Sequence, residues 1–222
     1  ADVVSSTVPC SNKWMIGTVN SFFIGFVATF IATTLGTLAA LGLSRPHMPY
    51  KGLIMAILIS PMIVPLIITA AGMFFFYARI NLVYSFTGII LAHVALATPF
   101  VVITVTATLV GFDMNMVKAS QSLGARPVRT FFKVIMPLIL PGVISGALFA
   151  FITSFDEVVI VMFMASLDQL TIPKQMWAGI RQEISPVILC MATCLVILSI
   201  LLLTTVELLR RRSEKLRGIK SR

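Results

Sequence analysis

Charged residues are scarce in this 222-residue chain, and acidic residues are the scarcest of them. Only 11% of the residues are charged, and Asp and Glu together number 8, whereas about 25% of the residues of a soluble domain are charged. Hydrophobic residues make up 58% of the chain, and its mean hydropathy is +1.02. This balance excludes an ordinary soluble domain and predicts an all-α, polytopic bundle of membrane-spanning helices.

Cysteine is also rare. The three cysteines, Cys10, Cys190 and Cys194, show neither the spacing of a zinc site nor that of a disulfide framework. We therefore predict no metal centre. Cys190 and Cys194 lie one helical turn apart in an apolar run, and we expect both to be buried, as free cysteines commonly are.

The usual motifs of catalysis are missing. The sequence contains no GxxxxGK[ST] phosphate loop, no HExxH and no nucleophile elbow. The segment Gly124–Pro127 cannot replace a phosphate loop, because Pro127 has no backbone N–H and the segment contains no Lys-Ser/Thr pair. We predict that the chain is not an enzyme, has no ATPase site and binds no cofactor of its own.

Long apolar runs, in contrast, are abundant. Five stretches approach or exceed the roughly 20 residues that a helix needs to cross a bilayer. Residues 1–17 are predicted to be an extracytoplasmic segment, residues 18–209 a transmembrane domain with a loop at 111–141, and residues 210–222 a basic tail. The expected spans are Thr18–Leu43, Gly52–Phe76, Thr87–Val110, Gly142–Ala165 and Pro186–Leu208.

The basic residues are divided unequally between the two sides of these spans. Thirteen of the 17 Lys and Arg residues lie on the side of the 111–141 loop and the C-terminus. The positive-inside rule places that side, and the C-terminus, in the cytoplasm. The net charge of +9 is thus a topology signal, and we predict no nucleic-acid partner. An outside N-terminus without a visible signal peptide leads us to expect a sixth helix before residue 1.

The cytoplasmic segment Lys118–Pro141 is the most informative part of the sequence. We expect a helix over Asp113–Leu123, with Asp113 as its N-cap and Gly124 just after its end, where positive φ is needed. A second helix is expected to begin at Arg126-Pro127, since proline is tolerated in a first turn. This basic hairpin is either a docking surface for a cytoplasmic partner or a loop whose charges only fix topology.

Three ionisable side chains lie well inside the expected spans, away from their ends: His93, Asp156 and Glu157. A charge at that depth is costly and usually faces a cavity or a partner. The two carboxylates either provide a countercharge for a cationic substrate or make a structural or gating hydrogen bond. We interpret His93 as an interhelical hydrogen-bonding group. Pro61, Pro65 and Pro99 are expected to kink their helices.

The loop resembles the cytoplasmic signature of bacterial ABC-importer permeases, which runs Glu-Ala-Ala, three residues, Gly, then about nine residues to Ile-x-Leu-Pro. The matching residues here are Lys118-Ala119-Ser120, Gly124-Ala125 and Val134–Pro137, followed by Leu140-Pro141. Lys118 replaces the acidic residue, and Ser120 replaces the second alanine. The resemblance implies an ATPase-coupling loop that includes Lys118, Ala119, Ser120, Gly124, Ala125, Arg126, Pro127 and Pro137.

The resemblance extends to Asn20-Ser21, Ser60–Pro65 and Ser154–Glu157. These segments look most like the spermidine/putrescine branch, which also includes permeases for iron, phosphonates and opines. A type I importer fold with six helices is implied, five of them in this chain. Asp156, Glu157 and His93 are the candidate residues of the substrate path or gate.

The resemblance also implies a set of partners. They are a second permease subunit, two cytoplasmic ATP-binding subunits that hold ATP and Mg²⁺, and a periplasmic substrate-binding protein. The expected location is the bacterial inner membrane, and the expected function is ATP-driven import of a polyamine or a related small solute. The alternatives are an ion-coupled secondary transporter or channel, and a non-transporting scaffold that recruits a cytoplasmic partner.

Overall fold

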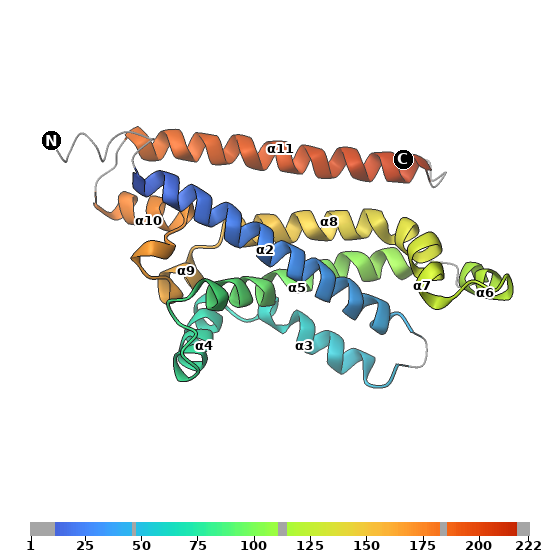
Figure 1. The fold of residues 1–222 in the computed structure, drawn as a ribbon. Helices are drawn as coiled ribbons and strands as arrows, with labels where there is room; N and C mark the ends of the chain where they lie inside the picture. Colours follow the sequence, from blue (N-terminus) through green and yellow to red (C-terminus); the bar gives the residue numbers. More distant parts are fainter. Residues whose placement is uncertain (1–11, 46–47, 111–114, 183–185, 217–222) are drawn as a thin grey trace.

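The computed structural model describes residues 12–45, 48–110, 115–182 and 186–216, and every regular element in this part of the chain is helical (Figure 1). Asp113, the expected N-cap, lies outside the described residues. The predicted all-α bundle is confirmed. Its longest helices are α2 (Asn12–Leu43), α5 (Phe86–Val110), α8 (Met136–Phe155) and α11 (Pro186–Leu216).

Helix α5 forms the centre of the bundle, and α2 and α8 pack against it. Small residues allow the close approach. A Cβ added to Gly36 of α2 would lie 2.7 Å from the Cβ of Val101 on α5, and one added to Gly142 of α8 would collide with the Thr108 hydroxyl. Helices in a membrane associate largely through such close backbone packing. The threonine hydroxyl of Thr108 bonds back to the carbonyl of Thr104 in its own helix, at 2.9 Å.

The second expected span is not one straight helix. It divides into α3 (Lys51–Ile63) and α4 (Leu66–Arg79), which meet at an angle of 103°. Val64 between them is extended, with φ −72° and ψ 136°, because a residue that precedes proline is pushed out of the helical region. The expected kink at Pro65 is therefore confirmed, and the expected span Gly52–Phe76 is a bent pair of helices instead of one continuous helix. Pro61 and Pro99 lie inside helices α3 and α5.

The fourth span ends earlier than expected. Helix α8 stops at Phe155 instead of continuing to Ala165, and a separate short helix, α9 (Val159–Met164), follows. The expected polar join after it contains a one-turn 3₁₀ helix (Leu167–Gln169) and α10 (Ile172–Gln182). Among the described residues, three helices are long and apolar enough to cross a membrane, or four if the bent pair counts as one, with a shorter apolar stretch in α11 at Pro186–Leu202.

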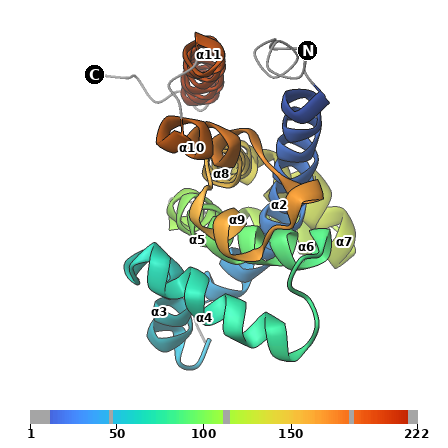
Figure 2. The ribbon, with the colours of Figure 1, turned by 90° about the vertical axis from the view of Figure 1, so that its left-hand side faces the viewer.

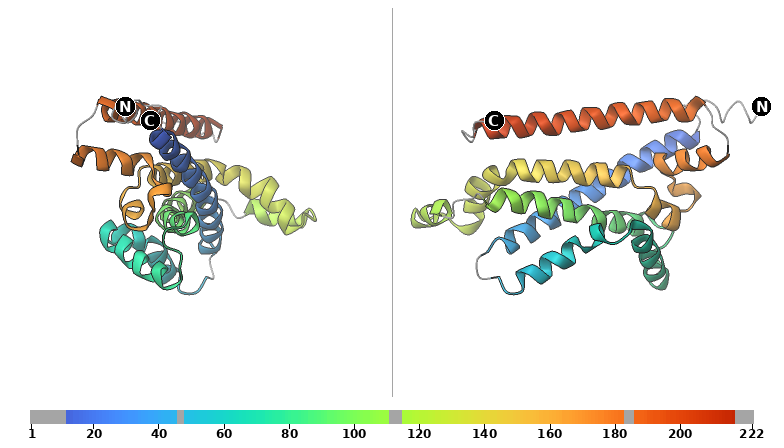
Figure 3. Two further views of the ribbon diagram at one scale, coloured as in Figure 1. Left: turned by 60° about the vertical axis from the view of Figure 1, so that its left-hand side comes forward. Right: turned by 180° about the vertical axis from the view of Figure 1, so that it is seen from behind.

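The connections gather at two ends of the bundle (Figures 1 and 3). Helices α6 (Asn115–Ser122) and α7 (Pro127–Thr130) lie at one end, together with the turn between α2 and α3 and the last turns of α11. Helices α9 and α10 lie at the other end, beside the first turn of α2. These two ends are the same two sides that the unequal distribution of Lys and Arg separates.

Helix α11 lies apart from the main bundle and contacts it mainly through α8 and α10 (Figure 2). Its residues Cys190 and Cys194 are free and exposed. The prediction that they are buried is therefore wrong. The rest of the described chain does not cover the face of α11 that carries them. An apolar run in the sequence does not show which face of a helix is covered.

Candidate functional site

The hairpin α6–α7 turns at Gly124, which adopts φ +77°. The N–H of Gly124 donates to the carbonyl of Gln121 at 2.9 Å, and the N–H of Ala125 donates to that of Ser120 at 3.1 Å. This pair of bonds is a Schellman motif, in which glycine takes the left-handed position after a helix. A Cβ at Gly124 would meet nothing within 4 Å. The predicted helix–Gly–helix hairpin is confirmed, and glycine is required there by its backbone angle, not by lack of space.

Ser120 joins the two arms of the hairpin. Its hydroxyl lies 3.0 Å from the Thr130 hydroxyl and donates to the carbonyl of Val117 at 2.9 Å. Thr130 is only 2% exposed, so this contact lies at the buried base of the hairpin. A serine at this position, where the resembling family has alanine, thus adds an internal bond that an alanine could not make.

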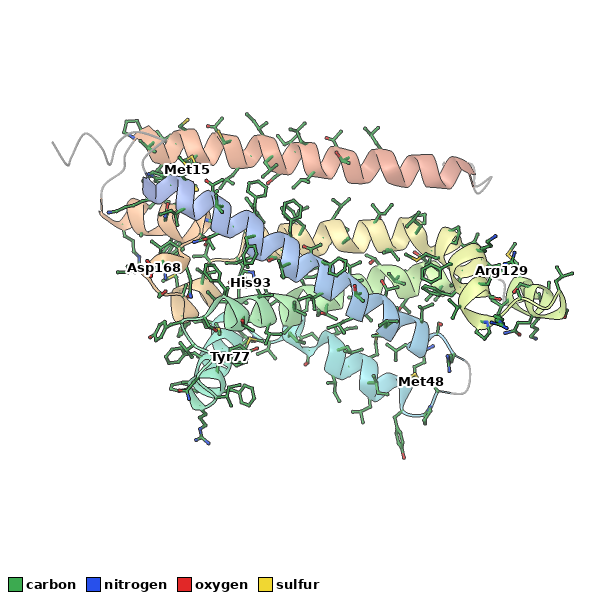
Figure 4. The ribbon with its side chains drawn as sticks, in the orientation of Figure 1. Met15, Met48, Tyr77, His93, Arg129 and Asp168 are labelled. Carbon is green, nitrogen blue, oxygen red and sulfur yellow. The ribbon has the colours of Figure 1, made fainter. Side chains whose placement is uncertain are left out.

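The outer surface of the hairpin combines positive charge with apolar side chains. Lys118, Arg126 and Arg129 are exposed, and Figure 4 shows Arg129 at this end of the molecule. Leu123 is 88% exposed and Val128 is 69% exposed. Large apolar side chains exposed beside cations are typical of a surface that contacts another protein. Ala119 and Pro127 are also exposed, whereas Ala125 is half-buried.

The hairpin continues into the membrane through a π-helical segment, Phe131–Ile135. The N–H of Met136 bonds to the carbonyl of Phe131, five residues back. Pro137 accounts for the wider turn, because it has no N–H for the Lys133 carbonyl and its ring crowds that group. Helical structure is nevertheless unbroken from Pro127 to Phe155. One continuous element therefore connects the hairpin with the opposite end of the bundle.

Asp156 and Glu157 lie at that opposite end, at the close of α8. Asp156 caps the helix with φ −88° and ψ 2°, and it is exposed. Glu157 is 7% exposed, and its Oε1 accepts the N–H of Ile160 at 2.9 Å. The expectation that both carboxylates lie within one continuous membrane helix is wrong. The break at residue 156 separates them into one exposed group and one buried helix cap.

Lys174 is a structural residue that no motif or pattern in the sequence indicates. Its Nζ donates to the carbonyls of Val161 at 3.1 Å and Ala165 at 3.2 Å, at the end of α9. A cation favours the negative end of a helix, as a carboxylate favours the positive end. Burial lowers the pKa of the Lys174 ammonium below its ordinary value. Two charged side chains thus stabilise α9, one at each end.

Asn20 and Ser21 attach the start of α2 to the same end of the bundle. The Asn20 side-chain amide donates to the carbonyls of Asp168 at 2.9 Å and Leu170 at 3.1 Å. The Ser21 hydroxyl accepts the N–H of Ile172 at 2.9 Å. The polar pair that the sequence singled out therefore anchors the segment that leads into α10, and Figure 4 places Asp168 at this end.

His93 belongs to α5 and is 1% exposed, inside the bundle (Figure 4). Its Nδ1 lies 2.8 Å from the hydroxyl of Ser154, and this contact joins α5 to α8. The prediction of an interhelical hydrogen bond is confirmed. Among the described residues, His93 bonds to Ser154 and Glu157 bonds to Ile160. No hydrogen bond in this part of the chain joins the three candidate path residues to one another, so they do not form one cluster. The described residues contain no group of three His, Cys, Asp or Glu side chains that could hold a metal ion.

Comparisons with known proteins agree with this arrangement. The chain is 31% identical over 196 residues to the spermidine/putrescine transport system permease protein PotC of Haemophilus influenzae, covering 88% of this chain and 76% of the relative. It is 30% identical to PotC of Escherichia coli K12, covering 86% of this chain and 72% of the relative. The putrescine transport system permease protein PotI of Escherichia coli K12 is 29% identical, covering 78% of this chain and 64% of the relative.

Solved structures share the fold. The inward-facing MetNI methionine ABC transporter matches with a TM-score of 0.73 and 20% identity, covering 92% of this chain and 98% of that chain. An amino acid ABC transporter with histidines matches with a TM-score of 0.67 and 18% identity, covering 93% and 97%. A family profile described as "Binding-protein-dependent transport system inner membrane component" matches residues 32–215. The chain therefore belongs to the family of inner-membrane components of binding-protein-dependent transport systems.

Proposed function

We propose that this chain is a permease subunit of an ATP-driven importer of polyamines in the bacterial inner membrane. The observation that carries the proposal is the α6–α7 hairpin, which presents cations and exposed Leu123 and Val128 at the basic end of the bundle. The positive-inside rule supports a cytoplasmic position for that end and for the C-terminus. A cytoplasmic ATPase subunit is the partner that such a surface fits in a transport complex.

The proposed coupling mechanism depends on the unbroken helical stretch Pro127–Phe155. Closure of two ATPase subunits would push on the hairpin, and Pro127–Phe155 would carry the movement through the membrane. A helix of that length extends about 40 Å, at 1.5 Å per residue. The movement would reach Asp156 at the outer end, where a periplasmic binding protein delivers substrate. A second permease subunit would complete the path.

Asp156 is the best candidate for contact with a cationic substrate. Glu157 is buried as a helix cap, and His93 bonds to Ser154. Asp156, in contrast, is exposed at the outer end. The names of the relatives, which are spermidine/putrescine and putrescine permeases, favour a polyamine over iron, phosphonate or opine substrates.

Reconstitution tests the proposal. The complex with its second permease, ATPase subunits and binding protein is placed in liposomes, and uptake of radiolabelled spermidine and putrescine is measured. We expect uptake that requires ATP and stops when the ATPase subunits are omitted. Uptake driven by an ion gradient without ATP would support a secondary transporter instead. ATP-dependent uptake of iron or a phosphonate, but of no polyamine, would overturn the substrate assignment alone.

A further inference from the structure

A cavity of about 330 Å³ lies at the base of the hairpin, where α2 leaves the bundle. Its walls come from the last turn of α2, the end of α5, both arms of the hairpin and the π-helical segment. Ligand sites typically occupy roughly 300–1,000 Å³, so this cavity is large enough for part of a small amphipathic molecule. The substrate path described above does not include this cavity, although the hairpin forms part of its wall.

The lining of the cavity is divided into an apolar wall and a polar rim. Leu41, Leu109, Phe131 and Ile135 contribute to the wall. The rim includes Arg45, whose guanidinium is the only cationic group among the lining residues that the structure describes. A site of this composition fits a ligand with one anionic group and a hydrocarbon chain.

Two of the polar side chains that line the cavity already form hydrogen bonds within the protein. The Ser44 hydroxyl already donates to the Leu41 carbonyl at 2.9 Å, and the Thr130 hydroxyl pairs with that of Ser120 at 3.0 Å. Arg45 and Gln121, in contrast, are exposed side chains on the rim. Guanidinium groups bind phosphate oxygens through two parallel hydrogen bonds, and an amide can add a third donor.

The position of the cavity indicates where the ligand comes from. Exposed apolar side chains of α2, including Phe30 at 75% and Leu38 at 60%, lead along the helix toward Arg45. A lipid chain packed on that face would reach the cavity without leaving the membrane. Basic pockets between membrane helices on the cytoplasmic side suit the head groups of anionic lipids, which concentrate in that leaflet.

We propose that this cavity binds an anionic phospholipid, with its phosphate paired to Arg45 and part of one acyl chain against Leu41, Leu109 and Phe131. The proposal shares the membrane orientation of the proposed function but does not depend on its substrate. Because the walls belong to both α2 and the hairpin, the bound lipid joins the two. It stabilises the arrangement in which the hairpin is held against the end of α2, and its loss frees the hairpin to move.

Lipid binding to the assembled complex tests the proposal directly. Phosphatidylglycerol is titrated into the delipidated complex in detergent, and retained lipid is counted by native mass spectrometry. We expect one retained phosphatidylglycerol molecule per copy of this chain. Phosphatidylcholine should be retained at least about tenfold less well, because the contact with Arg45 is charge-assisted. Arg45→Ala should lower phosphatidylglycerol retention by a similar factor.

Two further variants separate the cavity from general attraction to a basic surface. Lys51→Ala removes an exposed cation from the same end, outside the cavity lining, and should leave retention unchanged. Leu109→Phe fills part of the cavity without changing its charge and should reduce lipid retention. This result counts only if the melting temperature of the variant without lipid matches that of the parent protein. If Leu109→Phe fails this folding check, Arg45→Ala against Lys51→Ala decides the question.

The contrary outcomes are distinct. Equal losses in Arg45→Ala and Lys51→Ala would mean nonspecific attraction and would overturn the proposal. Full displacement of the lipid by millimolar inorganic phosphate would also overturn it, because the site would then recognise a free anion. Since lipid retention is measured without transport, failure of the polyamine assignment would leave these results unaffected.

Discussion

Glu157 and Lys174 hold opposite ends of the same short helix, α9. The Glu157 carboxylate accepts a backbone N–H in its first turn at 2.9 Å, and the Lys174 ammonium donates to carbonyls at its end at 3.1 and 3.2 Å. Each charge opposes the partial charge of the helix terminus that it contacts. Glu157 is therefore occupied by structure, whereas its neighbour Asp156 is exposed. Adjacent carboxylates thus have different environments and, we expect, different effects when they are neutralised.

Asp156→Asn should reduce uptake of a polyamine without reducing stability. Loss of one charge-assisted contact costs about 1.5 kcal/mol or more, which corresponds to roughly tenfold weaker transport at low substrate concentration. The measurement is uptake of spermidine in liposomes as a function of concentration. The matched control is Glu157→Gln, which keeps the side-chain oxygen that caps α9. Unchanged uptake by Asp156→Asn would remove this residue from the path.

Glu157→Ala should lower stability because the first turn of α9 loses its cap. Removal of such a cap typically costs about 1 kcal/mol, and the buried N–H of Ile160 would lose its partner. Thermal unfolding of the purified complex, followed by circular dichroism, measures the effect. Glu157→Gln should fall between the parent and the alanine variant. Equal melting temperatures for all three proteins would contradict the capping role.

The hairpin could be predicted from sequence because its determinants are local. Gly124 supplies the positive φ of a helix end, and Pro127 begins the next helix, so both act within a few residues of themselves. The interhelical bond of His93 was also predictable, since a polar group at membrane depth needs a partner. The identity of that partner, Ser154, depends on helix packing and was not.

The ends of the fourth span were mispredicted because apolar sequence continues past a structural break. Asp156 lies between two apolar runs, so a span from Gly142 to Ala165 looked uninterrupted, although α8 ends at Phe155. An all-round apolar pattern marks neither the face nor the end of a helix. The caps of α9 come in part from Lys174, which is distant in sequence, and no local rule identifies such a contact.

Gly124→Val should uncouple ATP hydrolysis from transport. A β-branched residue in the left-handed region costs about 1–2 kcal/mol, so the C-terminal end of α6 would shift to relieve the backbone strain. Space is not the limitation, since a Cβ there meets nothing within 4 Å. Gly124→Asn is the matched control, because asparagine tolerates this region and should retain most activity. The ratio of substrate taken up to ATP hydrolysed measures coupling, and equal ratios for the valine variant and the parent would show that the backbone turn at Gly124 has no part in coupling.

Pro137→Ala should convert the π-helical segment into regular α-helix. The alanine restores an N–H for the Lys133 carbonyl and removes the ring that crowds it. The change from five-residue to four-residue bonding would rotate the hairpin relative to α8 and lower coupling, while the variant should be at least as stable as the parent. Pro141→Ala, one turn further into α8, is the control and should affect coupling less. Equal coupling in both variants would show that the π segment has no part in transmission.

Lys118→Glu should weaken association with the ATPase subunit. Lys118 is exposed on α6, near the exposed cations Arg126 and Arg129, so we expect an acidic surface on the partner. An exposed ion pair contributes about 0.2–1 kcal/mol, and reversal replaces attraction with repulsion, so affinity should fall roughly three- to tenfold.

Binding of the purified ATPase subunit to the permease in nanodiscs is measured at two salt concentrations. The difference should shrink at high salt, where exposed charges are screened. Arg79→Glu makes the same reversal at the last residue of α4 and should leave binding unchanged. Tighter binding by Lys118→Glu would instead mean that the ATPase presents a basic surface, as for the acidic residue that Lys118 replaces.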